Sequence, residues 1–400
     1  HPLRRATVWT VGSFVLYSVN YSLLLADLSS CCGLLILKVL AINKTIGETP
    51  MQYRSFGSLD WKPSALGFGA MRLPTIDNDP AQIDEVESTR MVRYAIDHGV
   101  NYVDTAYPYH RENSERFLGR ALQDGYRERI KLATKMPCWK VEKAEDFDLF
   151  LDEQLEKLQT DHVDFYLLHG LNGKRWTEMN DLNVLRWAEG AIASGRIRHL
   201  GFSFHDKYDA FQEIVDASDL WAFCQIQYNF MDVEYQAGTK GLRYAAEKGL
   251  AVVVMEPLRG GQFTKSIPPT VQEIWDGAPV QRTPAEHALQ WIWNQPEVSV
   301  VLSGMSTFEQ VQENVVSAER SGAGTLTEEE LDLYNGVRAE YEALCPIPCT
   351  DCKYCLPCPS GVNIPRVFDI YNDAIIYDNV EGAQGAYKYF MNEDERANLC

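Results

Sequence analysis

The sequence predicts an α/β protein, a (β/α)₈ TIM barrel followed by a small, mostly helical C-terminal segment. Two observations lead to this prediction. Short apolar runs alternate with amphipathic stretches of helical period, and eight such pairs follow one another over about 250 residues. A doubly wound open sheet is the alternative. That fold normally carries a glycine-rich dinucleotide turn after its first strand, and the Gly67–Gly69 segment is too short a match.

The expected strands are short runs rich in β-branched and aromatic residues, bounded by polar or turn residues. They are expected at 65–67, 102–104, 130–134, 164–168, 199–202, 224–227, 251–255 and 298–302. The intervening segments repeat apolar residues with helical spacing. Helices are expected near 81–98, 112–123, 145–158, 181–194, 207–217, 237–248, 285–294 and 308–318.

Changes in composition predict the domain boundaries. Residues 51–325 form the barrel, with a hairpin near 53–62 closing its bottom. Residues 326–344 form a linking helix, which Thr327 and Glu330 begin with a capping box. Residues 345–400 form the cysteine-containing C-terminal segment.

Residues 1–50 differ from the rest of the chain. Arg4 and Arg5 precede an apolar stretch over 8–42, as in a signal or anchor sequence. Asn20 and Asp27 interrupt this stretch, which makes it a poor membrane span. We interpret 1–50 as an extension outside the functional protein, with a membrane anchor or a cleaved targeting segment as the alternatives.

The net charge and the placement of the cysteines limit the classes of function and the cellular setting that are expected. The net charge is −19, and an acidic chain repels nucleic-acid phosphates, so no nucleic-acid partner is expected. Five of the ten cysteines fall between Cys345 and Cys358. That clustering is unlike a disulfide framework, and it indicates a reducing, cytoplasmic setting with one metal site.

Candidate catalytic residues follow three successive strands, where barrel active sites lie. They are Asp104, Tyr109, Lys135 and His169. Carbonyl reduction needs a proton donor at the carbonyl oxygen, and Tyr109 suits that role if the Lys135 ammonium lowers its pKa. Asp104 is expected to hold Lys135, and His169 to orient the carbonyl.

These residues stand in the motifs DTAYPY, TK and LLH, and from about residue 53 to 318 the sequence resembles the aldo-keto reductase family. The resemblance implies a small-molecule carbonyl substrate and NAD(P)H bound in extended form across the barrel mouth. It also implies that Ser203 and Gln225 hold the nicotinamide carboxamide. The implied contacts toward the phosphates and the adenosine end are Ser303, Gly304, Gln310, Glu313 and Asn314.

The sequence also departs from that family at the cofactor site. Phe204 replaces an Asn, and Met255 replaces the aromatic residue that stacks on nicotinamide. Gly304 and Gln310 stand where Lys and Arg bind a 2′-phosphate. NADPH is therefore expected on family grounds alone, with NADH as the alternative.

The C-terminal cysteines have the spacing Cys349-x₂-Cys352-x₂-Cys355-x₂-Cys358-Pro. Bacterial ferredoxin segments read C-x₂-C-x₂-C-x₃-C-P, so these four cysteines are predicted to bind a 4Fe-4S cluster. Zinc and free thiols are the alternatives. The segment resembles the ferredoxin-like tail of an aldo-keto reductase subgroup, in which a second cysteine motif follows. We expect Cys400 to be the first ligand of that motif in a truncated chain.

The predicted function is an NAD(P)H-dependent oxidoreductase that reduces an aldehyde or ketone. One alternative is an electron-transfer iron–sulfur protein whose partner is a redox protein. A second is a cofactor-binding regulatory subunit with little turnover. A membrane partner is expected only if residues 8–42 are a real anchor.

Overall fold

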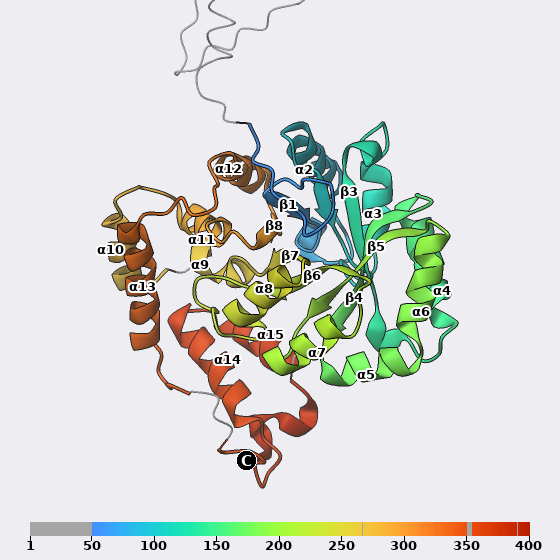
Figure 1. Cartoon of the computed structure of the whole chain (residues 1–400). Coiled ribbons are helices and arrows are strands. Elements are labelled where there is room, and N and C mark those ends of the chain that lie inside the picture. The colour runs from blue at the N-terminus through green and yellow to red at the C-terminus, as the bar shows by residue number, and fades with distance from the viewer. Residues whose placement is uncertain (1–49, 266, 350–353, 390) are drawn as a thin grey trace, which may run out of the picture. The chain divides into compact units, whose positions relative to one another are not determined.

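The computed structural model describes residues 50–400 except 266, 350–353 and 390. The strands in this range form one closed, all-parallel barrel in chain order (Figure 1). They are β1 (Leu66–Gly69), β2 (Tyr102–Asp104), β3 (Lys131–Met136), β4 (Val163–Leu171), β5 (Ile197–Phe204), β6 (Trp221–Gln227), β7 (Ala251–Met255) and β8 (Val298–Ser303). The barrel and all eight predicted strands are confirmed, with shifts of a few residues at their ends.

Helices surround the barrel and cover its outer face (Figure 1). Those of the barrel region are α2 (Glu85–Asp97), α3 (Ser114–Ala121), α4 (Asp146–Leu158), α5 (Gly173–Asp181), α6 (Val184–Ala193), α7 (Tyr208–Asp216), α8 (Gly238–Glu247), α9 (Gln262–Lys265), α10 (Pro269–Asp276), α11 (Pro284–Trp293) and α12 (Phe308–Glu319). After the barrel come α13 (Glu328–Ala343), α14 (Ile364–Ile376) and α15 (Val380–Tyr389).

The prediction missed three helices, α5, α9 and α10. Helix α5 buries only Trp176 and Met179, so its sequence lacks a continuous apolar stripe. Helix α9 has four residues and follows Gly260 and Gly261, which punctuate a sequence as a loop does. The missed helices lie in the β4–β5 and β7–β8 connections, both at the carboxyl ends of strands.

The N-terminal hairpin closes the barrel bottom, as predicted. Antiparallel bridges join Tyr53 to Ser64 and Phe56 to Leu59. The Phe56 ring is fully buried, with its centroid 4.8 Å from the Phe165 ring. Phe56 thus belongs to the core cluster inside the barrel rather than to the layer between strands and helices.

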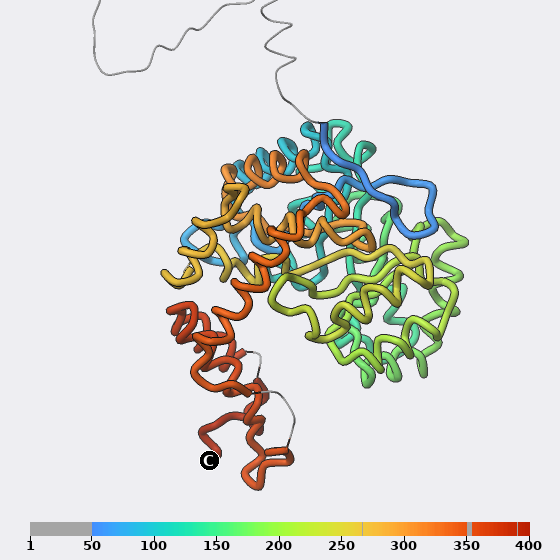
Figure 2. Tube along the Cα trace, turned by 60° about the vertical axis from the view of Figure 1, so that its left-hand side comes forward, coloured from blue at the N-terminus to red at the C-terminus, as the bar shows by residue number. Residues whose placement is uncertain are grey.

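Helix α13 begins with the predicted capping box. The Thr327 hydroxyl accepts from the Glu330 N–H, and the Glu330 carboxylate accepts from the Thr327 N–H. Buried Tyr334, Val337 and Tyr341 attach this helix to the barrel. Figure 2 follows the chain from α13 into α14 and α15, which lie side by side.

No helix in the described part of the chain combines the length and the apolar character needed to cross a bilayer. The stretch 8–42, interpreted above as an extension or an anchor, lies outside the described residues, as do Cys31 and Cys32.

Phe56 gives a test of the barrel-bottom packing. Phe56→Ala removes a fully buried ring and is expected to lower the free energy of unfolding by about 3–5 kcal/mol. Urea denaturation followed by circular dichroism measures the change. The control is Val86→Ala on α2, where an 85% exposed side chain is expected to change stability by less than about 0.5 kcal/mol. Similar values for the two variants would contradict the role given to Phe56.

Candidate active site

A buried ion pair joins the ends of β2 and β3. The Lys135 Nζ lies 2.5 Å from Asp104 Oδ1 and 2.7 Å from the Thr105 carbonyl oxygen. The Lys135 and Asp104 side chains are 1% and 3% exposed, so water screens this pair little. Their neighbouring strands are parallel, and this brings both side chains to the same end of the barrel.

Tyr109 lies in the loop after β2, with its hydroxyl oxygen 3.4 Å from Lys135 Nζ. The three residues after Tyr109 have left-handed backbone conformations, which is unusual for non-glycine residues. They are His110, Arg111 and Glu112, with φ of 50°, 51° and 70°.

The His110 ring fixes this loop. Its Nε2 accepts from the Leu73 N–H at 3.2 Å, and its Nδ1 lies 3.0 Å from the Pro80 carbonyl oxygen. Since a carbonyl can only accept, these contacts define a neutral ring with the proton on Nδ1. Burial lowers the pKa of His110, in agreement with the neutral form.

The pKa of Tyr109 differs from the sequence prediction. Burial raises it above the ordinary value of 10.0, and the Lys135 charge opposes this rise without outweighing it. Burial acts to lower the pKa of Lys135, but the Asp104 carboxylate and Tyr109 outweigh burial, and the pKa is raised. The expected net lowering of the Tyr109 pKa is therefore wrong, because desolvation of the phenolate is the larger effect. Tyr109 is protonated and Lys135 is charged at neutral pH.

His169, in β4, lies beside Tyr109. The two rings are edge to face with their centroids 6.1 Å apart, and the Trp139 ring lies 5.2 Å from the His169 ring. Burial and then the Lys135 charge lower the pKa of His169 well below 6.5, so the ring is neutral. Its Nδ1 is buried and has no hydrogen-bond partner among the described residues. The structure thus brings all four predicted catalytic side chains together.

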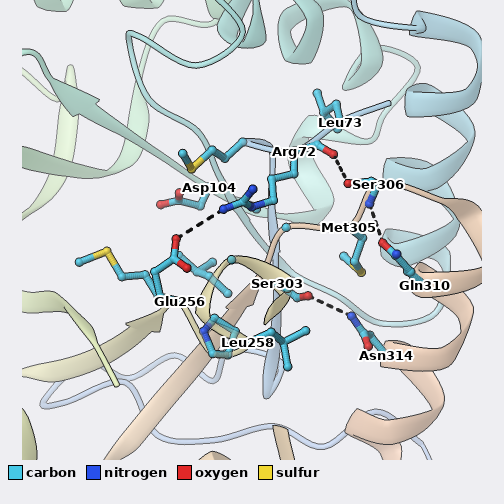
Figure 3. Close-up of a pocket in the computed structure, with 18 of the residues that line it drawn as sticks. Arg72, Leu73, Asp104, Glu256, Leu258, Ser303, Met305, Ser306, Gln310 and Asn314 are labelled. Atoms are coloured by element: carbon cyan, nitrogen blue, oxygen red, sulfur yellow. Dashed lines mark hydrogen bonds and ion pairs between the residues drawn. The ribbon is translucent and has the colours of Figure 1, made fainter. Parts of the chain in front are cut away.

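A cavity of 630 Å³ opens beside Asp104 and Tyr109 and extends along the ends of β7 and β8 to α12 (Figure 3). Six of the seven predicted cofactor residues line it: Gln225, Ser303, Gly304, Gln310, Glu313 and Asn314. Ser203 does not line it. Its buried hydroxyl instead accepts from the Gly170 N–H at 2.7 Å.

Several lining side chains are already paired. Asn314 donates to the Ser303 hydroxyl at 2.9 Å, and Gln310 accepts from the Ser306 N–H at 2.8 Å (Figure 3). The Glu313 carboxylate accepts from the Thr283 hydroxyl. By contrast, Gln225 Oε1 is buried and has no partner within the described ranges, so it is available to a bound group.

Arg72 lines the same cavity and was missed by the sequence analysis. Its guanidinium lies 3.8 Å from a Glu256 carboxylate oxygen, and its backbone carbonyl accepts from the Ser306 hydroxyl at 2.8 Å (Figure 3). A Cβ on Gly304 would lie 3.3 Å from the Arg72 stem, so Gly304 makes room for Arg72. The sequence does carry a signal for it, since Arg72 follows the end of β1 by three residues.

Phe204 and Met255 also depart from the family pattern at the cofactor site, and the structure places them differently. Phe204 is fully buried and packs against Phe211, at a ring-centroid distance of 5.1 Å, so it faces the core rather than the cavity. Met255 lines the cavity, at the end of β7.

The structure describes three of the four predicted metal ligands, and these three are exposed or partly exposed. Cys352 lies outside the described residues, Cys349 and Cys355 are exposed, and Cys358 is partly exposed. Within the described ranges, no three His, Cys, Asp or Glu side chains are arranged to hold a metal ion. The donors described therefore do not by themselves form a cluster site, and the iron–sulfur expectation stays a prediction.

A carboxylate, a lysine ammonium, a phenol and an imidazole gather at the carboxyl ends of barrel strands, beside a cavity, and this arrangement fits the class of (β/α)₈-barrel oxidoreductases. The chain belongs to the aldo/keto reductase family, whose family model matches residues 65–333.

Several known proteins are similar to this chain. An uncharacterized oxidoreductase, YqkF, of Bacillus subtilis is 28% identical over 70% of this chain and 94% of its own length. L-galactose dehydrogenase of Arabidopsis thaliana is 26% identical over 67% and 88%. Among solved structures, the holo form of aldo-keto reductase AKR11C1 from Bacillus halodurans has a TM-score of 0.60 and 27% identity, covering 72% of this chain and 96% of that one. An aldo-keto reductase from Klebsiella pneumoniae in complex with NADPH has a TM-score of 0.57 and 24% identity, covering 72% and 95%.

The buried ion pair makes a stability prediction. Lys135→Met leaves the Asp104 carboxylate buried without its partner, and we expect the free energy of unfolding to fall by about 3–5 kcal/mol. The double variant Asp104→Asn/Lys135→Met is expected to recover part of this loss. Chemical denaturation of both variants measures the difference.

Lys131→Met is the matched control on the same strand. Lys131 also pairs with a carboxylate, Asp164, at 2.8 Å, but its side chain is 43% exposed and Arg127 holds the same carboxylate at 3.0 Å. Its loss is expected to be below about 1 kcal/mol. A Lys135→Met variant as stable as this control would contradict the view that Lys135 neutralises a buried charge.

Proposed function

We propose that this protein reduces an aldehyde or ketone to an alcohol with NAD(P)H as the hydride source. The observation that carries the proposal is a protonated phenol, Tyr109, placed 3.4 Å from the ammonium of a buried Lys–Asp pair and on the wall of a 630 Å³ cavity. In the overall reaction, the carbonyl carbon gains a hydride and the carbonyl oxygen gains a proton. The cofactor supplies the hydride when bound.

Tyr109 is the proton donor in this proposal. Burial keeps the phenol protonated at neutral pH, so the proton is available for transfer to the carbonyl oxygen. As the proton leaves, the nearby Lys135 ammonium stabilises the phenolate. Asp104 holds Lys135 in place, and neutral His169 can donate a hydrogen bond that orients the carbonyl.

The cavity suits an extended dinucleotide. The buried, unpaired Gln225 Oε1 can accept from a carboxamide, and the Ser303–Ser306 backbone leads to the N-terminus of α12, a favourable place for a phosphate. Arg72 adds a cation beside Gly304, where the expected Lys is missing. These features suit NAD(P)H, and on family grounds we assign the cavity to NADPH, with NADH as the alternative.

The role of Tyr109 has a direct test. Tyr109→Phe is expected to lower kcat for NADPH-dependent reduction by about 10²–10⁴-fold, because it removes the proton donor. NADPH binding, measured by quenching of protein fluorescence, is expected to stay within about twofold, since no phosphate or amide contact changes. Undiminished reduction by Tyr109→Phe would rule out the proposed mechanism.

Tyr107→Phe is the matched control. It makes the same substitution two residues away, where the hydroxyl lies 3.2 Å from a Glu153 carboxylate rather than beside Lys135. Its effect on kcat is expected to be small. A regulatory subunit with little turnover would show no reductase activity in any of these proteins.

We also propose, from cysteine spacing alone, that residues 345–400 bind an iron–sulfur cluster. Protein purified anaerobically is expected to contain iron and to show an EPR signal after reduction. Cys349→Ser/Cys355→Ser is expected to lose both, whereas Cys224→Ala, which changes a buried thiol in β6, should keep them. Colourless, iron-free wild-type protein would contradict the cluster.

A further inference from the structure

Arg175 is a cation next to His169 that the proposed mechanism does not use. It lies in the first turn of α5, where its backbone N–H donates 2.8 Å to the Asn172 side chain that caps the helix. Its side chain turns back toward β4, and Nη1 donates to the carbonyl oxygen of Gly170, the residue after His169. Hydrogen bonds therefore fix both the backbone and the guanidinium of Arg175.

The guanidinium and the His169 ring share a neighbour. The Arg175 Cζ lies 6.0 Å from the centroid of the Trp139 ring, and that ring is edge-on to His169 at 5.2 Å. Trp139 is 44% exposed, so its indole presents a flat surface to solvent between the cation and the candidate catalytic imidazole. A group bound against the exposed Trp139 ring would therefore lie close to both Arg175 and His169.

Arg175 has no charged partner in the part of the chain that the structure describes. No carboxylate oxygen there lies within 4.0 Å of its guanidinium, whereas the adjacent Lys174 pairs with Glu178 at 3.7 Å. Arg175 is partly exposed, and its guanidinium is a cation in a chain with a net charge of −19. Among the described residues, a single hydrogen bond to the Gly170 carbonyl leaves most of the five N–H donors of Arg175 without a partner.

The charge of Arg175 also affects the pKa of two nearby histidines. Burial lowers the pKa of both His169 and His205, and the Arg175 charge lowers each further. These shifts agree with the contacts in placing the guanidinium near the imidazole that would orient the carbonyl.

We propose that Arg175 binds a carboxylate on the substrate, so that the protein reduces aldehydes or ketones that carry a carboxylate group. This proposal rests on the reductase function proposed above. An arginine guanidinium matches a carboxylate with two parallel hydrogen bonds, and such bonds are stronger than neutral ones. Trp139 supplies a flat wall for the part of the substrate between the carboxylate and the carbonyl.

The test compares two aldehydes of similar size. The probes are 4-carboxybenzaldehyde, which is an anion at neutral pH, and 4-carbamoylbenzaldehyde, which is neutral. Arg175→Met removes the charge but keeps a long side chain, and it is expected to lower kcat/KM for the anion at least about tenfold, mostly through KM. The neutral probe is expected to change less than about threefold, because it gains little from the guanidinium.

Two further variants make the result specific. Lys174→Met makes the same charge change one residue away, on a side chain that is 87% exposed and points to Glu178, and it is expected to leave both probes unchanged. Arg175→Lys keeps the charge but not the paired hydrogen bonds, and it is expected to recover part of the preference for the anion. Equal losses for both probes in Arg175→Met, or a wild-type preference for the neutral probe, would overturn the proposal.

A binding measurement separates this proposal from the reductase function. If wild-type protein reduces neither probe, calorimetric titration with 4-(hydroxymethyl)benzoate still tests Arg175. Binding to wild type that is lost in Arg175→Met supports the carboxylate site even if the reductase function fails. Absence of binding to wild-type protein would overturn the site.

Discussion

The chemistry of the site depends on how the buried Lys135 ammonium is satisfied. A lysine ammonium has three N–H donors, and three acceptors surround this one: Asp104, the Thr105 carbonyl and the Tyr109 hydroxyl. Leaving a charge buried without partners is strongly unfavourable. The need to satisfy Lys135 therefore sets the spacing between the phenol and the carboxylate, and it does so before any substrate binds.

The backbone of Lys135 is held from the opposite side by a second buried network. The Gln154 side chain donates 3.0 Å to the Lys135 carbonyl and also donates to the Glu115 carboxylate at 2.5 Å. Thr134, the residue before Lys135, donates to the same carboxylate at 2.6 Å. Helices α3 and α4 thus fix β3, and with it Lys135, from outside the barrel.

The parts of the site that the sequence predicted are those that depend on local pattern. Strand periodicity located Asp104 and Lys135, and the order of parallel strands in a barrel brought their side chains together. Other features of the site depend on tertiary packing. The space above Gly304 is occupied by Arg72, from the far end of the barrel sequence, and Phe204 turns into the core against Phe211.

The pKa of Tyr109 illustrates the same limit. The sequence correctly identified Lys135 as a group that favours the phenolate, but the sign of the net shift depends on how deeply the phenol is buried. Burial is set by the three left-handed residues that follow Tyr109 and by the His110 ring, which fastens their loop to Leu73 and Pro80. No local pattern predicts that arrangement.

Two arginines add positive charge near the site: Arg72 in the loop after β1 and Arg175 in the first turn of α5. Arg72 lines the cavity together with Asp104 and Tyr109. The Arg175 Cζ lies 6.0 Å from the Trp139 ring centroid, near His169, and neither Arg175 nor Trp139 lines that cavity. In a chain with a net charge of −19, local cations near the site attract anions that the rest of the surface repels. The strand ends thus hold Asp104, Lys135 and His169, the loop after β2 holds Tyr109, and the segments that follow β1 and β4 add the two cations.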